Sequence, residues 1–394
     1  MKNAVVLDIG SSKVVSICAS RIGLDGLAVH GADIRSYNGY RFGEFSDISN
    51  IKQVVLDSLK ATERECGFYL RDVVISIPAP FTELVIGTGK LSFESAPKRI
   101  TGADIDKLIS ASLPQAPPEG CRLIHSTPFS YVVDGAKKEE LNADTSAAVI
   151  EAEVSHVYAR ESFLKPVQEA IKQADMRPGV SISTQLGQAL MLIPEKERQK
   201  PTVLLDVGYT HTDISIVLHS AIVAQKTLEV GGMHLAGDLA YGLDVPIAIA
   251  EPVKRRYVFS LDYQDSIELV RTPQGTYSVE RSLIQYIIEE RAHELCYMIV
   301  DAIAELGIAA ACKPAIHLTG GGLALMRGSL EYLEKMLGLS VRRDMPWMPR
   351  MNSPNYASTF GTLEFALNAS KNGASVHQAE SGVFGWLKEL FIAK

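Results

Sequence analysis

Two short segments, far apart in the chain, carry the residue types that can grip a phosphate chain. Each is an apolar strand that ends in Asp-x-Gly and turns through hydroxyl residues, with Asp8 and Gly10 in the first and Asp206 and Gly208 in the second. Glycine lets backbone N–H groups approach phosphate oxygens, hydroxyl groups donate hydrogen bonds, and carboxylates hold Mg²⁺ through water. The repetition indicates two related half-molecules, and the two turns together predict a nucleotide clamp.

A third turn, Gly320-Gly321-Gly322, follows another apolar strand. Three consecutive glycines cost backbone entropy on ordering, and at the end of a strand they usually mark a backbone that passes close to something flat or bulky. An adenine ring with its ribose fits that description. A single Asp-x-Gly turn is also an ordinary hairpin signal, so the prediction of nucleotide binding rests on the three turns together.

Polar partners for the ribose are expected between the second and third turns. Gly231-Gly232 begins a helix, and Glu251 and Lys254, three residues apart, would share a helix face. A solvated ion pair is the alternative interpretation, but the position of the pair favours a nucleotide contact. The expected nucleotide-binding residues are Asp8, Gly10, Ser11, Ser12, Lys13, Asp206, Gly208, Tyr209, Thr210, His211, Thr212, Gly231, Gly232, Glu251, Lys254, Gly320, Gly321, Gly322 and Leu323, with Asp8 and Asp206 around Mg²⁺ through water.

Composition predicts a large globular protein of the cytoplasm. The chain has 394 residues, 46% hydrophobic and 22% charged, which is enough for two domains with full cores. Its net charge of −7 gives no electrostatic support for nucleic-acid binding. The five cysteines lack paired or metal-ligand spacing and are expected to be reduced core residues. We identify no export signal and no apolar run of membrane-spanning length.

The order of strands and helices predicts an α/β fold of two duplicated halves around a nucleotide cleft, with an inserted α+β subdomain in the first half. In the first half, apolar residues at helical spacing from Ile51 to Thr62 predict a helix capped by Asn50. The expected boundaries are 1–80 and 158–197 for the first half, with 353–367 returning to it, 81–157 for the inserted subdomain, 198–231 and 300–352 for the second half, and 232–299 for an insertion in the second half.

The end of the chain predicts a membrane-targeting helix. Residues 368–382 form a polar linker rich in Ser, Ala, Asn and Gly, and 383–394 read as an amphipathic helix. Such a helix can lie in the membrane interface, where Trp and Phe are favoured, although two Lys against one Glu give little attraction to anionic lipid. Docking on its own domain or in a partner's groove is the alternative. The expected membrane-contacting residues are Val383, Phe384, Trp386, Leu387, Leu390 and Phe391.

Taken in order, these motifs resemble those of the superfamily of actin, sugar kinases and heat-shock chaperone ATPases, and most of all the FtsA family of bacterial cell division. The resemblance covers nearly the whole chain, and includes Asp104 to Leu108, Leu123 to Pro128 and Tyr356 to Gly361. It implies the actin-like ATPase fold, with an extra subdomain in the first half in place of the corresponding actin subdomain.

The resemblance also implies a function. Members of the family bind ATP with Mg²⁺, self-associate into filaments, and attach peripherally to the cytoplasmic side of the cell membrane at the division site. There they tether the FtsZ ring and recruit other divisome proteins, with the second-half insertion contacting the C-terminal peptide of FtsZ. By this resemblance the chain is a cytoskeletal scaffold of the division septum.

The second turn departs from the family pattern. The family commonly has Asp-Ile-Gly-Gly-Gly-Thr, whereas here Tyr209, Thr210 and His211 follow Gly208. These side chains keep phosphates further away than glycine would, and His211 either donates to the γ-phosphate or fills the space. We therefore expect ATP binding with at most weak ATPase activity. Gln185 and Gln188 are candidates for orienting the attacking water, with a structural role as the alternative.

Two other protein classes share the superfamily. A sugar kinase or another phosphotransferase would need a positioned catalytic carboxylate, and no Asp or Glu occurs in Ser183 to Gln188. A pilus-assembly actin-like protein of the PilM type binds a short peptide, and the tail helix argues against that alternative. A heat-shock chaperone is excluded because only the linker and tail follow the ATPase part.

Overall fold

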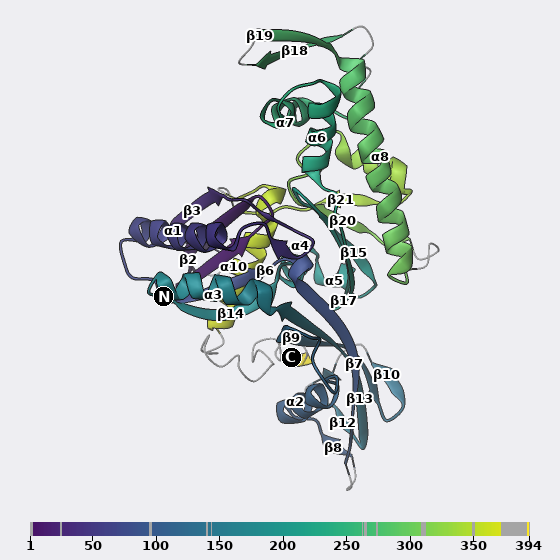
Figure 1. The fold of residues 1–394 in the computed structure, drawn as a ribbon. Helices are drawn as coiled ribbons and strands as arrows, with labels where there is room; N and C mark the ends of the chain where they lie inside the picture. Colours follow the sequence, from purple (N-terminus) through teal and green to yellow (C-terminus); the bar gives the residue numbers. More distant parts are fainter. Residues whose placement is uncertain are drawn as a thin grey trace. The chain divides into compact units, whose positions relative to one another are not determined.

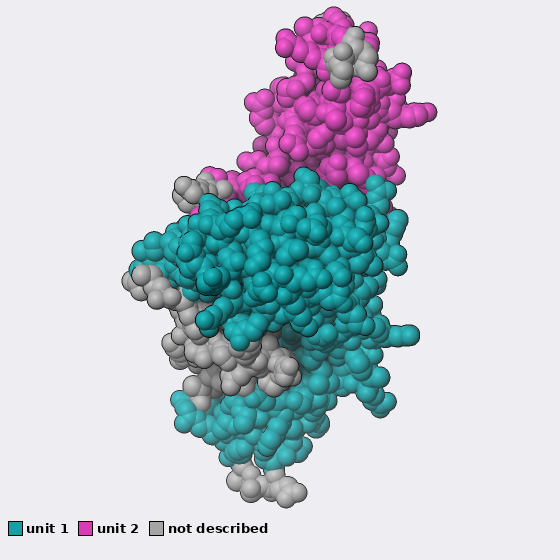
Figure 2. Space-filling model, turned by 60° about the vertical axis from the view of Figure 1, so that its left-hand side comes forward, with its two compact units in different colours: residues 1–200, 217–224, 358–394 teal, residues 201–216, 225–357 magenta. Residues whose placement is uncertain are grey.

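The structure is a computed structural model, drawn in Figure 1. It describes residues 3–23, 26–93, 97–138, 141–142, 144–261, 263, 266–272, 275–308, 313–348, 351–371 and 392–393. The chain divides into two compact units, coloured in Figure 2: unit 1 contains 1–200, 217–224 and 358–394, and unit 2 contains 201–216 and 225–357. The segment that returns to the first half therefore begins at residue 358, five residues after the expected 353.

A five-stranded sheet in the order β14-β6-β1-β2-β3 forms the centre of unit 1. β1 and β2 form the hairpin of the first turn, β2 and β3 are also antiparallel, and β6 and β14 run parallel to β1 and to each other. Buried apolar side chains of this sheet form one core with those of α1 and α3. The bounds are β1 Ala4–Ile9, β2 Lys13–Ile22, β3 Gly26–Ser36, β6 Asp72–Ile77, β14 Arg177–Ser183, α1 Ile48–Cys66 and α3 Glu161–Gln173.

The expected cap of α1 is wrong by three residues. The N-cap is Asp47, whose side chain accepts from the backbone N–H of Asn50 at 2.9 Å, and the helix begins at Ile48. The side chain of Asn50 instead accepts from the backbone N–H of Asn38 at 2.9 Å. Asp and Asn are both favoured N-cap residues, so local sequence does not distinguish Asp47 from Asn50. The hydrogen bond to Asn38 engages the side chain of Asn50, and Asp47 is the cap.

A separate four-stranded sheet, in the order β10-β9-β13-β7, lies in the segment expected to be an inserted subdomain. Helix α2 contacts β7 and β13 and shares a core with this sheet. Thr101 and Asp104 form a capping box at the start of α2, and Lys98 pairs with Asp104 at 2.8 Å. The bounds are β7 Thr82–Ser92, α2 Gly102–Ala111, β9 Cys121–Val133, β10 Ala136–Lys138 and β13 Val149–Arg160.

The second half repeats the strand order of the first. Its sheet is β17-β16-β15-β20-β21, which matches β3-β2-β1-β6-β14 strand for strand, with β15 parallel to β20 and β20 parallel to β21. This repeat is the duplication that the two Asp-x-Gly turns predict. The bounds are β15 Thr202–Val207, β16 Thr212–Leu218, β17 Ala221–Leu228, β20 Ile316–Thr319 and β21 Val341–Arg343.

The segment 232–299 of unit 2 is mainly helical. Helix α6 contacts α7 and α8, and the hairpin of β18 and β19 contacts the neighbouring helices α7 and α8. The bounds are α6 Gly232–Gly242, α7 Ile247–Arg256, β18 Ile267–Thr272, β19 Gly275–Glu280, α8 Arg281–Glu305 and α9 Ser329–Leu337. The remaining elements are β4 Tyr40–Arg41, β5 Glu44–Phe45, η1 Ala79–Phe81, β8 Lys98–Arg99, β11 Leu141–Asn142, β12 Ser146–Ala147, α4 Thr184–Leu192, α5 Glu195–Arg198, η3 Pro354–Tyr356, α10 Ala357–Lys371 and β22 Ile392–Ala393.

The expected membrane-targeting helix falls mostly outside the described residues, which include only Ile392 and Ala393 of the segment 383–394. These two residues form β22, which pairs in parallel with Leu141 and Asn142 of β11. The helix expected over 383–394 therefore does not include them. None of the helices that the structure describes is long and apolar enough to cross a membrane.

Candidate functional site

The first turn joins β1 to β2 in unit 1. The backbone N–H of Gly10 donates to the carbonyl of Lys13 at 2.9 Å, and the hydroxyl of Tyr37 donates to the carbonyl of Gly10 at 2.8 Å. Burial lowers the pKa of Lys13, and the charge of Asp8 partly offsets that effect. Ser11 is buried and Ser12 is half-buried. The structure thus gathers the expected residues of this turn, and adds Tyr37, which no sequence pattern indicated.

Asp8 is buried at the end of β1 and is held by α10. Its Oδ2 accepts hydrogen bonds from the hydroxyls of Ser358, at 2.6 Å, and Thr359, at 2.5 Å. Its Oδ1 is buried and has no hydrogen-bond partner among the described residues. Sequence reasoning missed both hydroxyls, although the segment Tyr356 to Gly361 that carries them resembles a family segment.

Gln185 and Gln188 lie on α4, and each is 1% exposed. Ser183 caps this helix, and its hydroxyl lies 3.0 Å from Nε2 of the buried His125. A Cβ on Gly361 of α10 would lie 2.5 Å from the carbonyl carbon of Gly187. Helices α4 and α10 therefore pack backbone against backbone, which places both glutamines in a close-packed region of unit 1.

The second turn, in unit 2, has the same closing bond as the first. The backbone N–H of Gly208 donates to the carbonyl of His211 at 2.9 Å. Nδ1 of His211 lies 3.1 Å from the hydroxyl of Thr210, and its Nε2 lies 3.3 Å from the carboxylate of Asp213. Thr212 donates to the carbonyl of Val230 at 2.7 Å. Because the ring of His211 contacts protein groups on both sides, the structure favours the space-filling alternative for this residue.

His211 is a buried base beside three carboxylates, of which Asp213 is also buried. Burial by itself would lower the pKa of His211, but the carboxylate of Asp213, with Asp206 and Glu229, raises it above its ordinary value. Asp213 is further held by the hydroxyl of Thr227, which donates to its other oxygen at 2.6 Å. The surroundings of His211 therefore favour the protonated form of the ring more than those of an isolated histidine do.

The glycine turns of unit 2 converge at distances that only glycine permits. A Cβ on Gly232 would lie 2.7 Å from Cα of Gly322, and a Cβ on Gly322 would lie 2.4 Å from the carbonyl oxygen of Gly208. Gly320 has φ +88°, and its Cβ would lie 2.3 Å from Oδ1 of Asp206. A Cβ on Gly231 would lie 2.9 Å from the carbonyl oxygen of Gly208. Three motifs at Gly208, Gly231-Gly232 and Gly320 to Gly322 thus form one cradle of bare backbone.

Lys254 joins the same cradle. It is 3% exposed, and its ammonium donates to the carbonyl of Gly232 at 2.8 Å. It also pairs with Glu251 at 2.8 Å, and Glu251 pairs with Arg255 at 2.8 Å. Burial lowers the pKa of Lys254, and Glu251 opposes the shift. The alternative of a solvated ion pair is therefore wrong for Lys254.

Two observations indicate that these residues are suited to a nucleotide with Mg²⁺. The first is the buried Oδ1 of Asp8, because a buried carboxylate oxygen normally has a partner. The second is the convergence of the glycine turns, where the bare backbones of Gly208, Gly232 and Gly322 pack together as they do where backbone must pass close to a ligand. Asp206 borders this cradle and is half-buried. Each unit by itself thus carries one aspartate of the expected magnesium pair.

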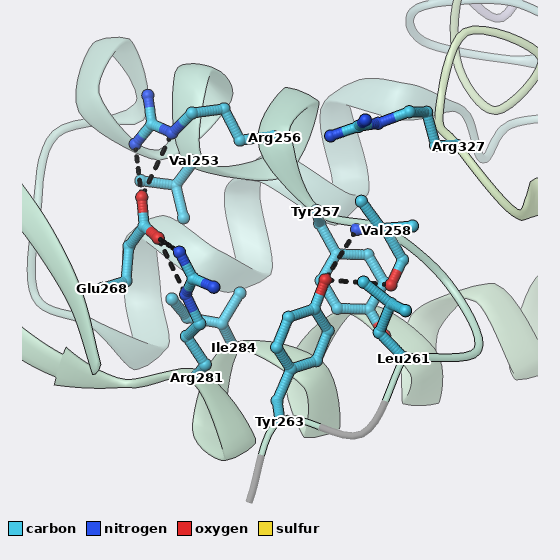
Figure 3. A pocket seen from close by; sticks show the side chains of 10 residues that line it. All are labelled: Val253, Arg256, Tyr257, Val258, Leu261, Tyr263, Glu268, Arg281, Ile284 and Arg327. Atoms are coloured by element: carbon cyan, nitrogen blue, oxygen red, sulfur yellow. Dashed lines mark hydrogen bonds and ion pairs between the residues drawn. The ribbon is translucent and has the colours of Figure 1, made fainter. Parts of the chain in front are cut away.

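Unit 2 also holds a cavity of about 310 Å³, between α7, the segment that follows it and the start of α8 (Figure 3). Glu268 accepts from Arg256 at 2.9 Å and from Arg281 at 2.8 Å. The hydroxyl of Tyr263 contacts both the N–H and the carbonyl of Val258 at 3.1 Å. Arg327 lines the cavity as well. The described residues of its lining include three arginines and one glutamate, and so carry a net positive charge.

Comparison with known proteins places these features in a sequence context. The family model described as "Cell division protein FtsA" matches residues 203–361. The chain is 24% identical to the cell division protein FtsA of Pseudomonas aeruginosa over 386 residues, covering 95% of this chain and 92% of that protein. It is 22% identical to FtsA of Neisseria meningitidis serogroup B over 393 residues, covering 96% and 94%. The resemblance to FtsA is confirmed.

Solved structures show the fold. A chain of the PilM-PilN type IV pilus biogenesis complex matches with a TM-score of 0.63 at 18% identity, covering 92% of this chain and 98% of that chain. MreB5 of Spiroplasma citri bound to ADP gives 0.55 at 14% identity, covering 94% and 98%. The MamK double helical filament gives 0.53 at 14% identity, covering 92% and 98%. The expected actin-like ATPase fold is confirmed.

Proposed function

Because the chain is similar to cell division proteins named FtsA over nearly its whole length and has the actin-like fold, we propose that it is an ATP-binding cytoskeletal scaffold of bacterial cell division. The glycine cradle of unit 2 is the observation that carries this proposal. Gly232 and Gly322 approach each other so closely that neither tolerates a Cβ, and Lys254 fixes the cradle through the carbonyl of Gly232.

The residues of both units would contribute to ATP binding. Gly10, Ser11, Ser12 and Lys13 would contact phosphates from unit 1, and the second turn, from Gly208 to Thr212, would contact them from unit 2. The nucleoside would lie against Gly320, Gly321, Gly322 and Leu323, with Glu251 and Lys254 as polar partners. Asp8 and Asp206 would hold Mg²⁺ through water, and the bound ion would neutralise phosphate charge.

Hydrolysis would be weak at most. The second turn contains Tyr209, Thr210 and His211, and the ring of His211 is paired with Asp213. Gln185 and Gln188 are the candidates for orienting water, but both lie where α4 packs closely on α10. A scaffold that binds ATP and assembles needs no fast turnover, so the proposed function does not depend on these glutamines.

ATP binding would favour self-association into filaments on the cytoplasmic side of the membrane. A solved relative in fold, MamK, forms a double helical filament, which supports self-assembly. The tail, with Val383, Phe384, Trp386, Leu387, Leu390 and Phe391, would insert into the membrane interface as a peripheral anchor at the division site. Each tail would bind weakly, and a filament would hold many tails on one surface.

The proposed partner of the second-half insertion is the C-terminal peptide of FtsZ. The cavity of Figure 3 lies mostly within residues 253–284 of this insertion. Among the described residues that line it, Arg256, Arg281 and Arg327 outnumber the carboxylate of Glu268, which favours an acidic peptide segment. Other divisome proteins would be recruited by the assembled filament.

A peptide-binding role of the PilM type is the second candidate. The likeness to the PilM chain supports it through the fold alone, since the identity is 18%. The sequence similarity to FtsA proteins favours cell division. A sugar-kinase-like phosphotransferase has less support, because no Asp or Glu occurs in Ser183 to Gln188.

Two glycines of the same helix, α6, test the nucleotide site. Gly232→Ala places a Cβ 2.7 Å from Cα of Gly322, whereas Gly237→Ala meets no atom within 4 Å. We expect Gly232→Ala to lower the affinity for ATP with Mg²⁺ by roughly tenfold or more, because the cradle must open. Titration calorimetry on the full chain measures the affinity, and thermal melting reports folding.

Gly237→Ala is the matched control and should bind ATP as the unaltered chain does. Equal affinity of both variants would contradict the assignment of the cradle to the nucleotide. Failure of the unaltered chain to bind ATP would contradict the proposed function itself.

A further inference from the structure

The carboxylate of Asp8 is held on one of its two oxygens. Oδ2 accepts from the hydroxyls of Ser358, at 2.6 Å, and Thr359, at 2.5 Å, while the buried Oδ1 has no hydrogen-bond partner among the described residues. The terminal torsion of an Asp side chain has broad, roughly two-fold wells. Two donors on the same oxygen therefore hold the plane of the carboxylate in one orientation.

The hydrogen bonds to Oδ2 of Asp8 are strong, whereas Oδ1 still lacks a donor among the described residues. Hydroxyl donors to an ionised carboxylate form short, charge-assisted hydrogen bonds, and here Thr359 is fully buried and Asp8 is 4% exposed. A buried carboxylate oxygen without a partner is unfavourable unless a ligand supplies one. The two donors come from α10, 350 and 351 residues further along the chain, so the contact fixes Asp8 to a different part of unit 1.

We propose that Ser358 and Thr359 are positioning residues that hold Asp8 Oδ2 and so present Oδ1 to the hydrated Mg²⁺ that accompanies ATP. This role rests on the proposed binding of ATP with Mg²⁺. The hydroxyls contact neither nucleotide nor metal; they act through the carboxylate alone. Without them, the plane of the carboxylate is no longer held in one orientation toward the ion, and part of the preorganisation is lost.

The same helix supplies a matched control. Thr362 is also fully buried on α10, and its hydroxyl donates to Ser76 Oγ at 3.2 Å rather than to Asp8. Replacing Thr by Val at either position removes a buried hydroxyl while keeping the shape of the side chain. A general effect of polar groups in α10 would therefore appear in Thr362→Val, and an effect on the magnesium site would not.

The experiment measures ATP affinity of the full chain in Mg²⁺ and in EDTA, together with the Mg²⁺ concentration that half-saturates binding. In the double variant Ser358→Ala, Thr359→Val we expect the Mg²⁺-dependent gain in affinity to fall roughly tenfold, while affinity in EDTA changes by less than about twofold. Thr362→Val should match the unaltered chain. Thr359→Ser keeps the hydroxyl and should restore the Mg²⁺ dependence in the single-site series.

Urea unfolding of each variant separates loss of folding from loss of metal response. If the double variant does not fold, Ser358→Ala alone, at a half-buried position, provides the same comparison. If the double variant, or Ser358→Ala in its place, has the Mg²⁺ dependence of Thr362→Val, the positioning role is overturned and the proposed function stays in place. Failure of the unaltered chain to bind ATP under either condition overturns both.

Discussion

At the scale of single residues, His211 lies in the second turn, which lacks two glycines of the family pattern implied by the resemblance. The imidazole occupies the second turn beside Asp213, and Thr227 holds the other carboxylate oxygen at 2.6 Å. Glycines would leave this space open. The chain instead fills it with an ion pair that is buried on both sides, with side-chain exposures of 8% and 6%. Breaking one partner of such a pair leaves the other charge buried and uncompensated.

This pair gives a pH-dependent contribution to stability. The pKa of His211 in the folded chain is raised above its unfolded value of 6.5. Its stabilising contribution is therefore fully present below pH 6.5 and is lost as the pH rises through the higher folded-state pKa. We expect His211→Gln to lower the free energy of unfolding by about 2 to 4 kcal/mol at acidic pH and by less at alkaline pH. Urea unfolding across this pH range measures both values.

Asp213→Asn provides the control, because it removes the acid that raises the pKa of His211. Asp213→Asn should therefore make the free energy of unfolding depend less on pH over the same range. A loss of stability in His211→Gln that is constant across the pH range would contradict a charged imidazolium in the second turn.

At the scale of elements, close backbone contacts set several of the packing distances. In the inserted segment, α2 packs on β7 so closely that a Cβ on Gly89 would lie 2.0 Å from the carbonyl oxygen of Leu108. A Cβ on Gly87 would lie 1.9 Å from the carbonyl oxygen of Ser112. Both contacts are to backbone, which cannot move without shifting the helix. The two glycines thus fix the distance between α2 and its sheet.

Gly89→Ala should therefore destabilise this subdomain. We expect a loss of about 2 to 3 kcal/mol in the free energy of unfolding, because α2 must move away from β7. Gly102→Ala, at the first position of α2, meets no atom within 4 Å and should be neutral or slightly stabilising. Chemical denaturation of both variants measures the difference, and equal stability would contradict the packing described for α2.

The sequence predicts elements better than it predicts their distant contacts. The apolar spacing predicts helix α1, but it does not fix the residue at which the helix begins. Asp47 caps the helix because the side chain of Asn50 binds the backbone N–H of Asn38 instead. The hydroxyls of Ser358 and Thr359 could not be assigned to Asp8, because no local pattern links residues 350 positions apart. The burial of Lys254 could not be predicted for the same reason, since it depends on the tertiary contact of its ammonium with the carbonyl of Gly232.

At the scale of the whole molecule, duplication is the feature that the sequence shows most clearly. The repeated Asp-x-Gly turns lie at equivalent positions, after β1 and after β15, in two sheets of the same strand order. Each compact unit carries one of these turns, with Asp8 in unit 1 and Asp206 in unit 2. The residue ranges of the units were less predictable, since residues 217–224 cluster with unit 1 although they continue the second-half sheet.

The end of the chain adds a second whole-molecule feature. Ile392 and Ala393 pair with β11 of the inserted segment, whereas an anchor would place the tail on a membrane. The expected membrane-contacting residues end at Phe391, directly before this pair, so the strand pairing would hold the end of the tail on the inserted segment.

Sedimentation with lipid vesicles tests the central claim most directly. The full chain, a chain that ends at Gly382 and the variant Trp386→Glu are each mixed with vesicles in Mg²⁺ with and without ATP, and filaments are viewed by electron microscopy. We predict that only the full chain sediments with vesicles, that ATP increases its sedimentation, and that filaments lie on the vesicle surface. If all three remain in the supernatant with ATP and no filaments form, the membrane scaffold is contradicted.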